Sequence, residues 1–230
     1  PTLGAKPAAP RLREAPDTLR IAVSSSTLKL NADFLSLCRA VESEAGRNVE
    51  FHFFPNEQGI RHHDCAHQVR QFLPSAIVHP RVGYDDYLAL LNECDIRFGT
   101  FPFGGANTTM DACLLGIPTV TLAGVEPHSR TDSRFVTLFE LPEWLVAKDM
   151  EAYLAAALRL IRNDAERIAL SRRILDADPG SVLFSKEQDA YPTDFADTLW
   201  WAYEHHETIL ATERRVWGWE DRIALAENSV

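Results

Sequence analysis

Short apolar runs alternate with amphipathic, helix-like stretches through the first half of the chain. The apolar runs are bounded by polar or glycine-containing loops and cover Leu19–Val23, Val49–Phe54, Ala76–Val78, Ile96–Phe98 and Thr119–Leu122. Between them, apolar residues recur at helical spacing in Leu30–Ala45, Ile60–Phe72, Tyr84–Asn92 and Thr108–Leu115. This alternation predicts an α/β fold with a Rossmann-like, doubly wound parallel sheet.

Composition narrows the possible functions. The 230 residues carry a formal net charge of −10, which argues against a broad surface for nucleic acid or anionic lipid. No apolar run approaches the roughly 18 residues of a membrane helix, and no signal peptide is recognisable. None of the four cysteines forms a CxxC pair, so buried, reduced thiols and a cytoplasmic location are expected for Cys38, Cys65, Cys94 and Cys113.

Three segments are expected along the chain. Residues 1–17 are rich in proline and alanine, as interdomain linkers are, which predicts that this chain is part of a longer protein. Residues 18–180 contain the α/β pattern and include a helical stretch at Met150–Arg173. Residues 181–230 form a tail with a predicted helix or helix pair at Pro192–Glu220. Its tryptophans could pack on the same domain or on a preceding one, and they are Trp200, Trp201, Trp217 and Trp219.

A glycine-rich turn before the fourth predicted helix is the strongest local signal for a ligand site. Glycines at 104 and 105 let the backbone approach a ligand closely. We expect Asn107 to cap the helix, with the N–H groups of Thr108 and Thr109 free to bind a diphosphate. Asp111, one turn later, is placed to accept hydrogen bonds from ribose hydroxyls. A capped surface helix with an acidic first turn is the alternative interpretation.

One lysine and a pair of histidines are further candidates for a ligand or metal site. Lys29 follows a strand and a Ser/Thr-rich loop, and a cation at a helix start is unfavourable unless an anion lies nearby. His63 and His67 are four residues apart but lack an HExxH pattern, so a polar helix face is the better interpretation. No Asp-x-Asp pair follows a strand. We therefore expect no metal cofactor, with lysine and helix N–H groups neutralising a leaving diphosphate.

Several segments together resemble the family 41 glycosyltransferases. They read, in order, IAVSSSTLKLNADFL, VEFHFF, VHPRVGYDDYLALLNECDI, FPFGGANTTMDACLLGIPTV and LPEWLVA, and the similarity runs from Leu19 to Asp178. The chain is most similar to the cytoplasmic bacterial enzymes that glycosylate adhesins at asparagine. It is more distantly similar to protein O-GlcNAc transferases. The FPFG motif, followed by Asn107 and then Asp111, and the separate LPEWLVA motif carry most of this resemblance.

The resemblance implies the C-terminal, UDP-hexose-binding domain of an inverting, metal-independent GT-B enzyme. The other parts of such an enzyme, including an N-terminal half that supplies much of the acceptor groove, would be partners of this chain. By position, the resemblance implies that Lys29 binds the diphosphate and takes part in catalysis. It implies phosphate contacts for Asn107 and Thr108, beside Thr109, and a ribose contact for Asp111. The uracil side is implied for Arg81, Tyr84 and Tyr87, and the sugar side for His128.

Two positions depart from the family pattern. Arg81 stands where the N-glycosyltransferases carry a histidine, which leaves nucleotide or sugar preference open. The loop after Phe54 is about one residue shorter, so Asn56 is a doubtful sugar contact.

Three classes of function remain open. The leading hypothesis is transfer of a hexose, with glucose favoured, from UDP to asparagine in Asn-x-Ser/Thr sites. An O-linked variant would transfer from UDP-GlcNAc to Ser or Thr through the same donor site. The other classes are a UDP-sugar epimerase of GT-B fold and a non-catalytic module that only binds nucleotide or a partner.

Overall fold

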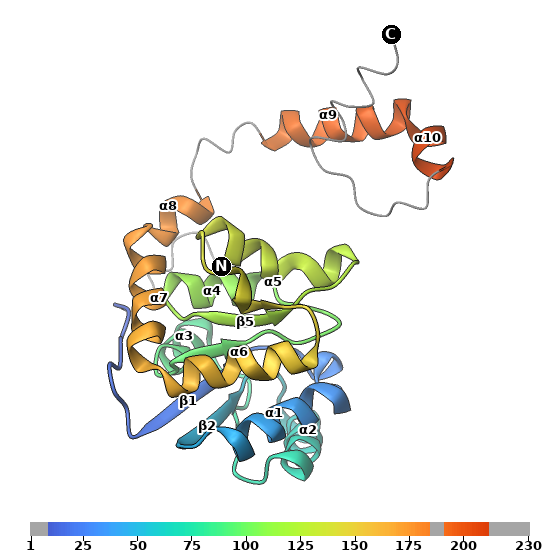
Figure 1. The fold of residues 1–230 in the computed structure, drawn as a ribbon. Helices are drawn as coiled ribbons and strands as arrows, with labels where there is room; N and C mark the ends of the chain where they lie inside the picture. The colour runs from blue at the N-terminus through green and yellow to red at the C-terminus, as the bar shows by residue number, and fades with distance from the viewer. Residues whose placement is uncertain (1–8, 185–190, 212–230) are drawn as a thin grey trace. The chain divides into compact units, whose positions relative to one another are not determined.

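A computed structural model describes residues 9–184 and 191–211, and the chain divides into two units, Pro1–Leu183 and Phe184–Val230. The first unit is built on a six-stranded parallel sheet in the order β3-β2-β1-β4-β5-β6 (Figure 1). Its strands are β1 (Thr18–Val23), β2 (Asn48–Phe53), β3 (Ile77–Val78), β4 (Ile96–Phe98), β5 (Thr119–Leu122) and β6 (Val146–Ala147). This order reverses direction between β1 and β4, as in doubly wound sheets, and confirms the predicted fold class.

Side-chain alternation along β1 explains why this strand lies at the centre of the sheet. Leu19, Ile21 and Val23 point into one hydrophobic core, whereas Ala22 belongs to the core on the other face. Both faces of the strand are therefore buried, as expected for a strand in a parallel sheet covered by helices. The strand pairs in parallel with β2 and with β4.

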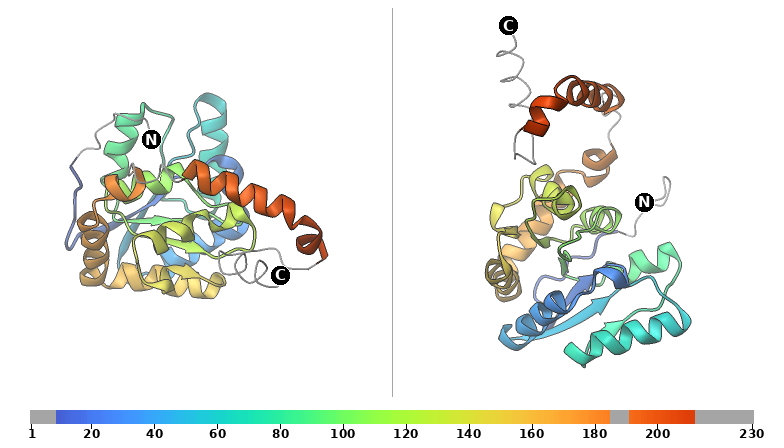
Figure 2. Two further views of the ribbon diagram at one scale, coloured as in Figure 1. Left: turned by 90° about the horizontal axis from the view of Figure 1, so that it is seen from above. Right: turned by 90° about the vertical axis from the view of Figure 1, so that its right-hand side faces the viewer.

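Helices cover both faces of the sheet (Figure 2). The larger core receives side chains from α1 (Ala32–Glu44), α2 (Gly59–Phe72), α5 (Pro127–Leu138), α6 (Met150–Arg162) and α7 (Asp164–Asp176). The smaller core is formed with α3 (Tyr84–Leu91) and α4 (Asn107–Leu114). Short 3-10 turns, η1 (Thr27–Lys29) and η2 (Glu143–Leu145), and the helix α8 (Pro179–Phe184) complete the described elements up to residue 184.

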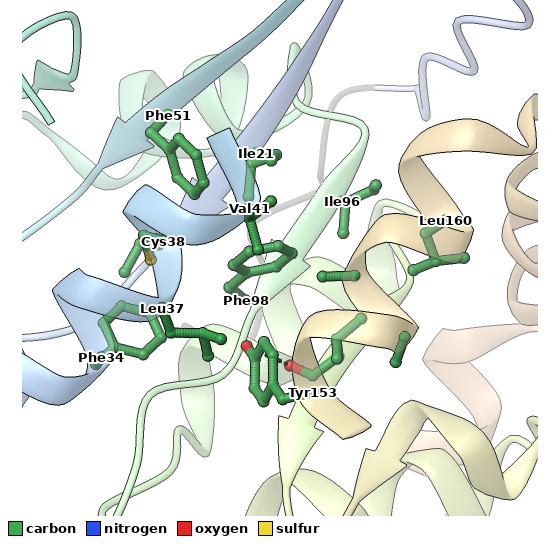
Figure 3. Close-up of a cluster of buried hydrophobic side chains, with 14 of the residues drawn as sticks. Ile21, Phe34, Leu37, Cys38, Val41, Phe51, Ile96, Phe98, Tyr153 and Leu160 are labelled. Atoms are coloured by element: carbon green, nitrogen blue, oxygen red, sulfur yellow. Dashed lines mark hydrogen bonds between the residues drawn. The ribbon is translucent and has the colours of Figure 1, made fainter. Parts of the chain in front are cut away.

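The larger core contains a tyrosine at its centre. Figure 3 shows Tyr153 of α6 beside Phe98 of β4, and their ring centroids are 5.6 Å apart. The Tyr153 hydroxyl donates to the carbonyl oxygens of Gly99, at 3.1 Å, and Val120, at 3.0 Å. Gly99 directly follows β4 and Val120 lies within β5, so these hydrogen bonds tie α6 to both strands.

The helical stretch expected at Met150–Arg173 is present and is divided into two helices, α6 and α7. The break falls at Asn163, whose side-chain oxygen accepts a hydrogen bond from the N–H of Glu166 at 3.1 Å. This is an N-cap, and it begins α7 at Asp164. The helical period continues through the break, so the pattern of apolar residues alone could not reveal it.

The expected linker, residues 1–17, is described from residue 9 and packs on the rest of the first unit. Arg13 forms an ion pair of 3.2 Å with the buried carboxylate of Asp95, and the N–H of Arg11 donates to Asn92 at 3.0 Å. The second unit contains α9 (Tyr191–Glu204) and α10 (His206–Ala211). Trp200 is exposed on α9, and Trp217 and Trp219 lie outside the described residues.

All four cysteines are buried, free thiols, as the sequence predicted. Among the described helices, none combines the length and apolar character that crossing a membrane requires.

Replacing Tyr153 with phenylalanine tests the central hydrogen bonds of this core. The ring still fills the same space, but the carbonyls of Gly99 and Val120 lose a buried donor, so we expect the free energy of unfolding to fall by about 1–3 kcal/mol. Urea denaturation followed by circular dichroism measures the change, with the exposed Tyr203→Phe as the control. Equal stability of Y153F and the control would show that the hydroxyl does not stabilise the fold.

Candidate nucleotide-sugar site

The loops that follow four strands gather at the carboxyl edge of the sheet. Lys29 follows β1, Arg81 follows β3, the glycine-rich turn follows β4 and His128 follows β5. In open parallel sheets, ligands bind at this edge near the reversal of strand order, which here lies between β1 and β4. The topology therefore brings together residues that are about 100 positions apart.

A pocket of about 360 Å³ opens at this edge. Five of the predicted site residues line it: Arg81, Tyr84, Tyr87, Thr108 and Asp111. Its remaining lining residues were not predicted as site residues, and they are Phe54, Asn56, Pro80 and Val82. The lining combines apolar and aromatic walls with a few polar groups, which is typical of small-molecule sites.

A hydrogen bond between Tyr84 and Asp111 crosses the pocket. The Tyr84 hydroxyl donates to Asp111 Oδ1 at 2.6 Å, which joins the start of α3 to the second turn of α4. Burial raises the pKa of Asp111 above its usual value, and the bond from Tyr84 opposes that rise. A carboxylate can accept more than one hydrogen bond, so Asp111 retains capacity for hydroxyl groups of a ligand.

An aromatic stack forms the wall beside this bond. The ring of Phe54 lies parallel to that of His79, with 4.5 Å between centroids, and meets Tyr87 edge-on at 5.5 Å. His52 Nδ1 lies 3.0 Å from His79 Nε2, and His52 Nε2 lies 2.7 Å from Glu50 Oε1. Burial lowers the pKa of His79 to about 4, so the ring that stacks on Phe54 is uncharged at neutral pH.

The helix α4 begins one residue earlier than the sequence predicted. Ala106, not Asn107, is the N-cap, because its carbonyl accepts from the N–H groups of Thr109 and Met110, both at 3.0 Å. Asn107 is the first helical residue and is exposed. The N–H of Thr109 is therefore already used, and its buried hydroxyl donates to Asp132, so Thr109 faces the protein and not the pocket.

Lys29 and His128 contact Gly104 of the glycine-rich turn and do not line the pocket. Lys29 Nζ donates to the carbonyl of Gly104 at 2.6 Å and sits 4.3 Å above the ring centre of Phe103. His128 stacks on Phe103 at 4.9 Å, and its carbonyl accepts from the N–H of Gly104 at 3.1 Å. Partial burial lowers the pKa of Lys29, while the charge of Asp132 opposes this effect.

A buried ion pair beneath the turn was missed by the sequence analysis. Arg97 of β4 and Asp132 of α5 have fully buried side chains, with Arg97 Nη1 3.4 Å from Asp132 Oδ1. Asp132 Oδ2 accepts from the N–H of Gly105 at 3.0 Å. One sequence signal could have revealed it, because an arginine inside an otherwise apolar strand needs a buried partner.

The histidines considered for a metal lie on α2. His63 and His67 are exposed, and within residues 9–184 and 191–211 no three histidine, cysteine or acidic residues converge as metal ligands would.

The sequence was compared with protein-family models and with curated proteins. No protein-family model matches the sequence. The chain is 36% identical over 176 residues to the UDP-glucose:protein N-beta-glucosyltransferase of Actinobacillus pleuropneumoniae, from both serotype 5b and serotype 7. The chain is therefore similar to one part of these glycosyltransferases. The match covers 76% of this chain but only 28% of the relatives' length, so the chain spans less than a third of those enzymes.

Solved structures share the fold of this chain. A mutant of the Thermobaculum terrenum O-GlcNAc transferase superposes with a TM-score of 0.70 at 20% identity, covering 85% of this chain and 38% of that one. A putative UDP-N-acetylglucosamine 2-epimerase from Listeria monocytogenes gives 0.51 at 14% identity, covering 86% and 47%. The sheet and its flanking helices have the fold of GT-B glycosyltransferases, as predicted.

Replacing Gly105 with alanine tests how tightly the turn is packed. A Cβ there would collide with Arg97 Nη2 and would approach Thr109 Oγ1 to 2.7 Å and Thr108 Oγ1 to 2.9 Å. We expect G105A to lower the free energy of unfolding by about 1–3 kcal/mol. The matched control is Gly83→Ala at the start of α3, where the nearest atom would lie at 3.5 Å. Equal urea midpoints for the two variants would contradict the tight packing.

Proposed function

We propose that this chain is the UDP-hexose-binding part of an inverting, metal-independent protein glycosyltransferase that modifies asparagine in Asn-x-Ser/Thr sites. The donor is proposed to be UDP-glucose, as the name of the curated relatives states for those enzymes. The observation that carries the proposal is the pocket at the carboxyl edge of the sheet, with Tyr84, Thr108 and Asp111 around it. The identity to the curated relatives supports the reaction class.

The pocket's chemistry fits a nucleoside better than a free sugar. In the proposal, the uracil ring lies against the wall formed by Phe54 and Tyr87, where aromatic contacts favour a flat heterocycle. Asp111 accepts hydrogen bonds from the ribose hydroxyls, in an orientation held by Tyr84. Arg81, which is exposed at the rim, is proposed to contact the base or its exocyclic oxygen.

The diphosphate is proposed to lie over the glycine-rich turn, between the pocket and Lys29. The start of α4 presents N–H groups of Asn107 and Thr108 and the positive end of the helix dipole. Lys29 supplies a positive charge at Gly104 of the same turn. These groups would stabilise negative charge as the hexose leaves UDP, which is the task a divalent cation performs in other enzymes. His128, beside Phe103, is proposed to face the transferred sugar.

The acceptor side is assigned to a further part of the enzyme. Because the match covers 28% of the relatives' length, the proposal places the acceptor groove, and the N-terminal half that forms it, outside this chain. The donor site proposed here would serve an O-linked enzyme using UDP-GlcNAc equally well. The 36% identity to an N-glucosyltransferase is the observation that favours asparagine. Cytoplasmic location remains a prediction from the reduced cysteines.

Calorimetric titration with UDP in the presence of EDTA tests the donor site. We expect UDP to bind without metal. We expect Lys29→Ala to weaken the affinity for UDP by about tenfold or more and to change the affinity for uridine little, because only UDP carries the charge that Lys29 pairs with. The matched control is Lys148→Ala, an exposed lysine after β6. UDP binding that requires Mg²⁺ or Mn²⁺ would contradict metal independence. Equal losses for UDP and uridine in K29A would place Lys29 away from the diphosphate.

A further inference from the structure

Arg97 has a second contact beyond its ion pair with Asp132. Its Nη2 lies 3.3 Å from Thr108 Oγ1, so one guanidinium reaches both Asp132 and the first turn of α4. The Nε of Arg97 has no hydrogen-bond partner among the described residues, although the side chain is fully buried. The positive group is thus held directly behind the proposed phosphate contacts, without touching solvent or the pocket.

Asp132 is fully occupied by the protein. Besides Arg97, it accepts hydrogen bonds from the N–H of Gly105 and from the hydroxyl of Thr109. These contacts of Asp132 hold the glycine-rich turn in place. Thr108 differs, because its side chain is only partly buried and it lines the pocket.

The direction of the Arg97–Thr108 bond determines what the Thr108 hydroxyl can do. A guanidinium only donates, so Thr108 Oγ1 is the acceptor in this bond. The hydroxyl's own proton must then point away from Arg97. With the hydroxyl lining the pocket, that proton is available to an acceptor there, and an anionic oxygen is the acceptor that would gain most.

We infer that Arg97 is a positioning residue that fixes the Thr108 hydroxyl as a hydrogen-bond donor to the ligand's phosphate. The inference deepens the proposed function, since it rests on a nucleoside diphosphate occupying this site. Arg97 acts entirely through Thr108 and does not contact the ligand. The ion pair with Asp132 keeps the buried guanidinium in place, and it leaves the second arm of the guanidinium free to reach Thr108.

A cycle of variants in the 230-residue chain tests the coupling. Arg97→Lys keeps a positive charge for Asp132 but loses the planar fork that reaches two partners. Thr108→Val removes the hydroxyl at nearly constant shape, and Thr108→Ser keeps it. Affinities for UDP, uridine and inorganic pyrophosphate are measured by calorimetry for each variant and for the R97K/T108V combination.

We expect R97K and T108V each to weaken the affinities for UDP and pyrophosphate by roughly tenfold and to change the affinity for uridine by less than about twofold. The combined variant should be no weaker than either single one, and T108S should restore most of the affinity. A merely structural role for Arg97 predicts different results, namely equal losses for UDP and uridine or losses that multiply in the combined variant. Either result would overturn the inference.

The outcomes also separate this inference from the proposed function. If wild type binds pyrophosphate, but not UDP, with the expected dependence on both residues, the inference stands and the proposed nucleotide is wrong. If UDP binds and R97K has no effect, the inference is wrong and the donor site stands. Failure to bind either ligand contradicts both. Should R97K not fold, Arg97→Met with Asp132→Asn removes both buried charges together and enters the same cycle.

Discussion

The ion pair between Arg97 and Asp132 is the interaction on which the candidate site depends. It joins β4 to α5, and Asp132 adds hydrogen bonds to the glycine-rich turn and to α4. Two fully buried charges are tolerated only when they are paired and hydrogen-bonded, and loss of one partner costs about 3–5 kcal/mol. Burying this pair costs free energy. In exchange, the glycine-rich turn is held in one conformation before any ligand binds.

A preformed turn has consequences for the whole edge of the sheet. Lys29 and His128 both bond to Gly104, so loops after β1 and β5 are organised around the same short segment. The Tyr84–Asp111 bond attaches α3 to α4 on the other side. The pocket and the lysine both adjoin the start of α4 and the turn before it, an arrangement that suits a ligand with a ring at one end and negative charge in the middle.

The sequence predicted the sheet and most pocket residues because these follow from local patterns. Five apolar runs became strands, and Arg81, Tyr84, Tyr87, Thr108 and Asp111 line one pocket. It did not predict α5, because Pro127–Leu138 is mostly polar and buries only a few side chains. The role of Asp132 on that helix depends on its ion pair with Arg97, which lies 35 residues earlier in the sequence. Tertiary packing determines pairings of this kind, and a single sequence does not show that packing. The orientation of Thr109 was predicted wrongly for the same reason, because its hydroxyl also bonds to Asp132.

Hydrogen–deuterium exchange of the chain with and without UDP tests most directly whether this turn is a preorganised donor site. The amide of Gly105, bonded to buried Asp132, should exchange slowly already in the free protein. Addition of UDP should further protect residues 104–111 and 80–87 and leave α6 and α7 unchanged. Rapid exchange at Gly105 in the free protein, or protection by UDP that avoids both segments, would contradict this account.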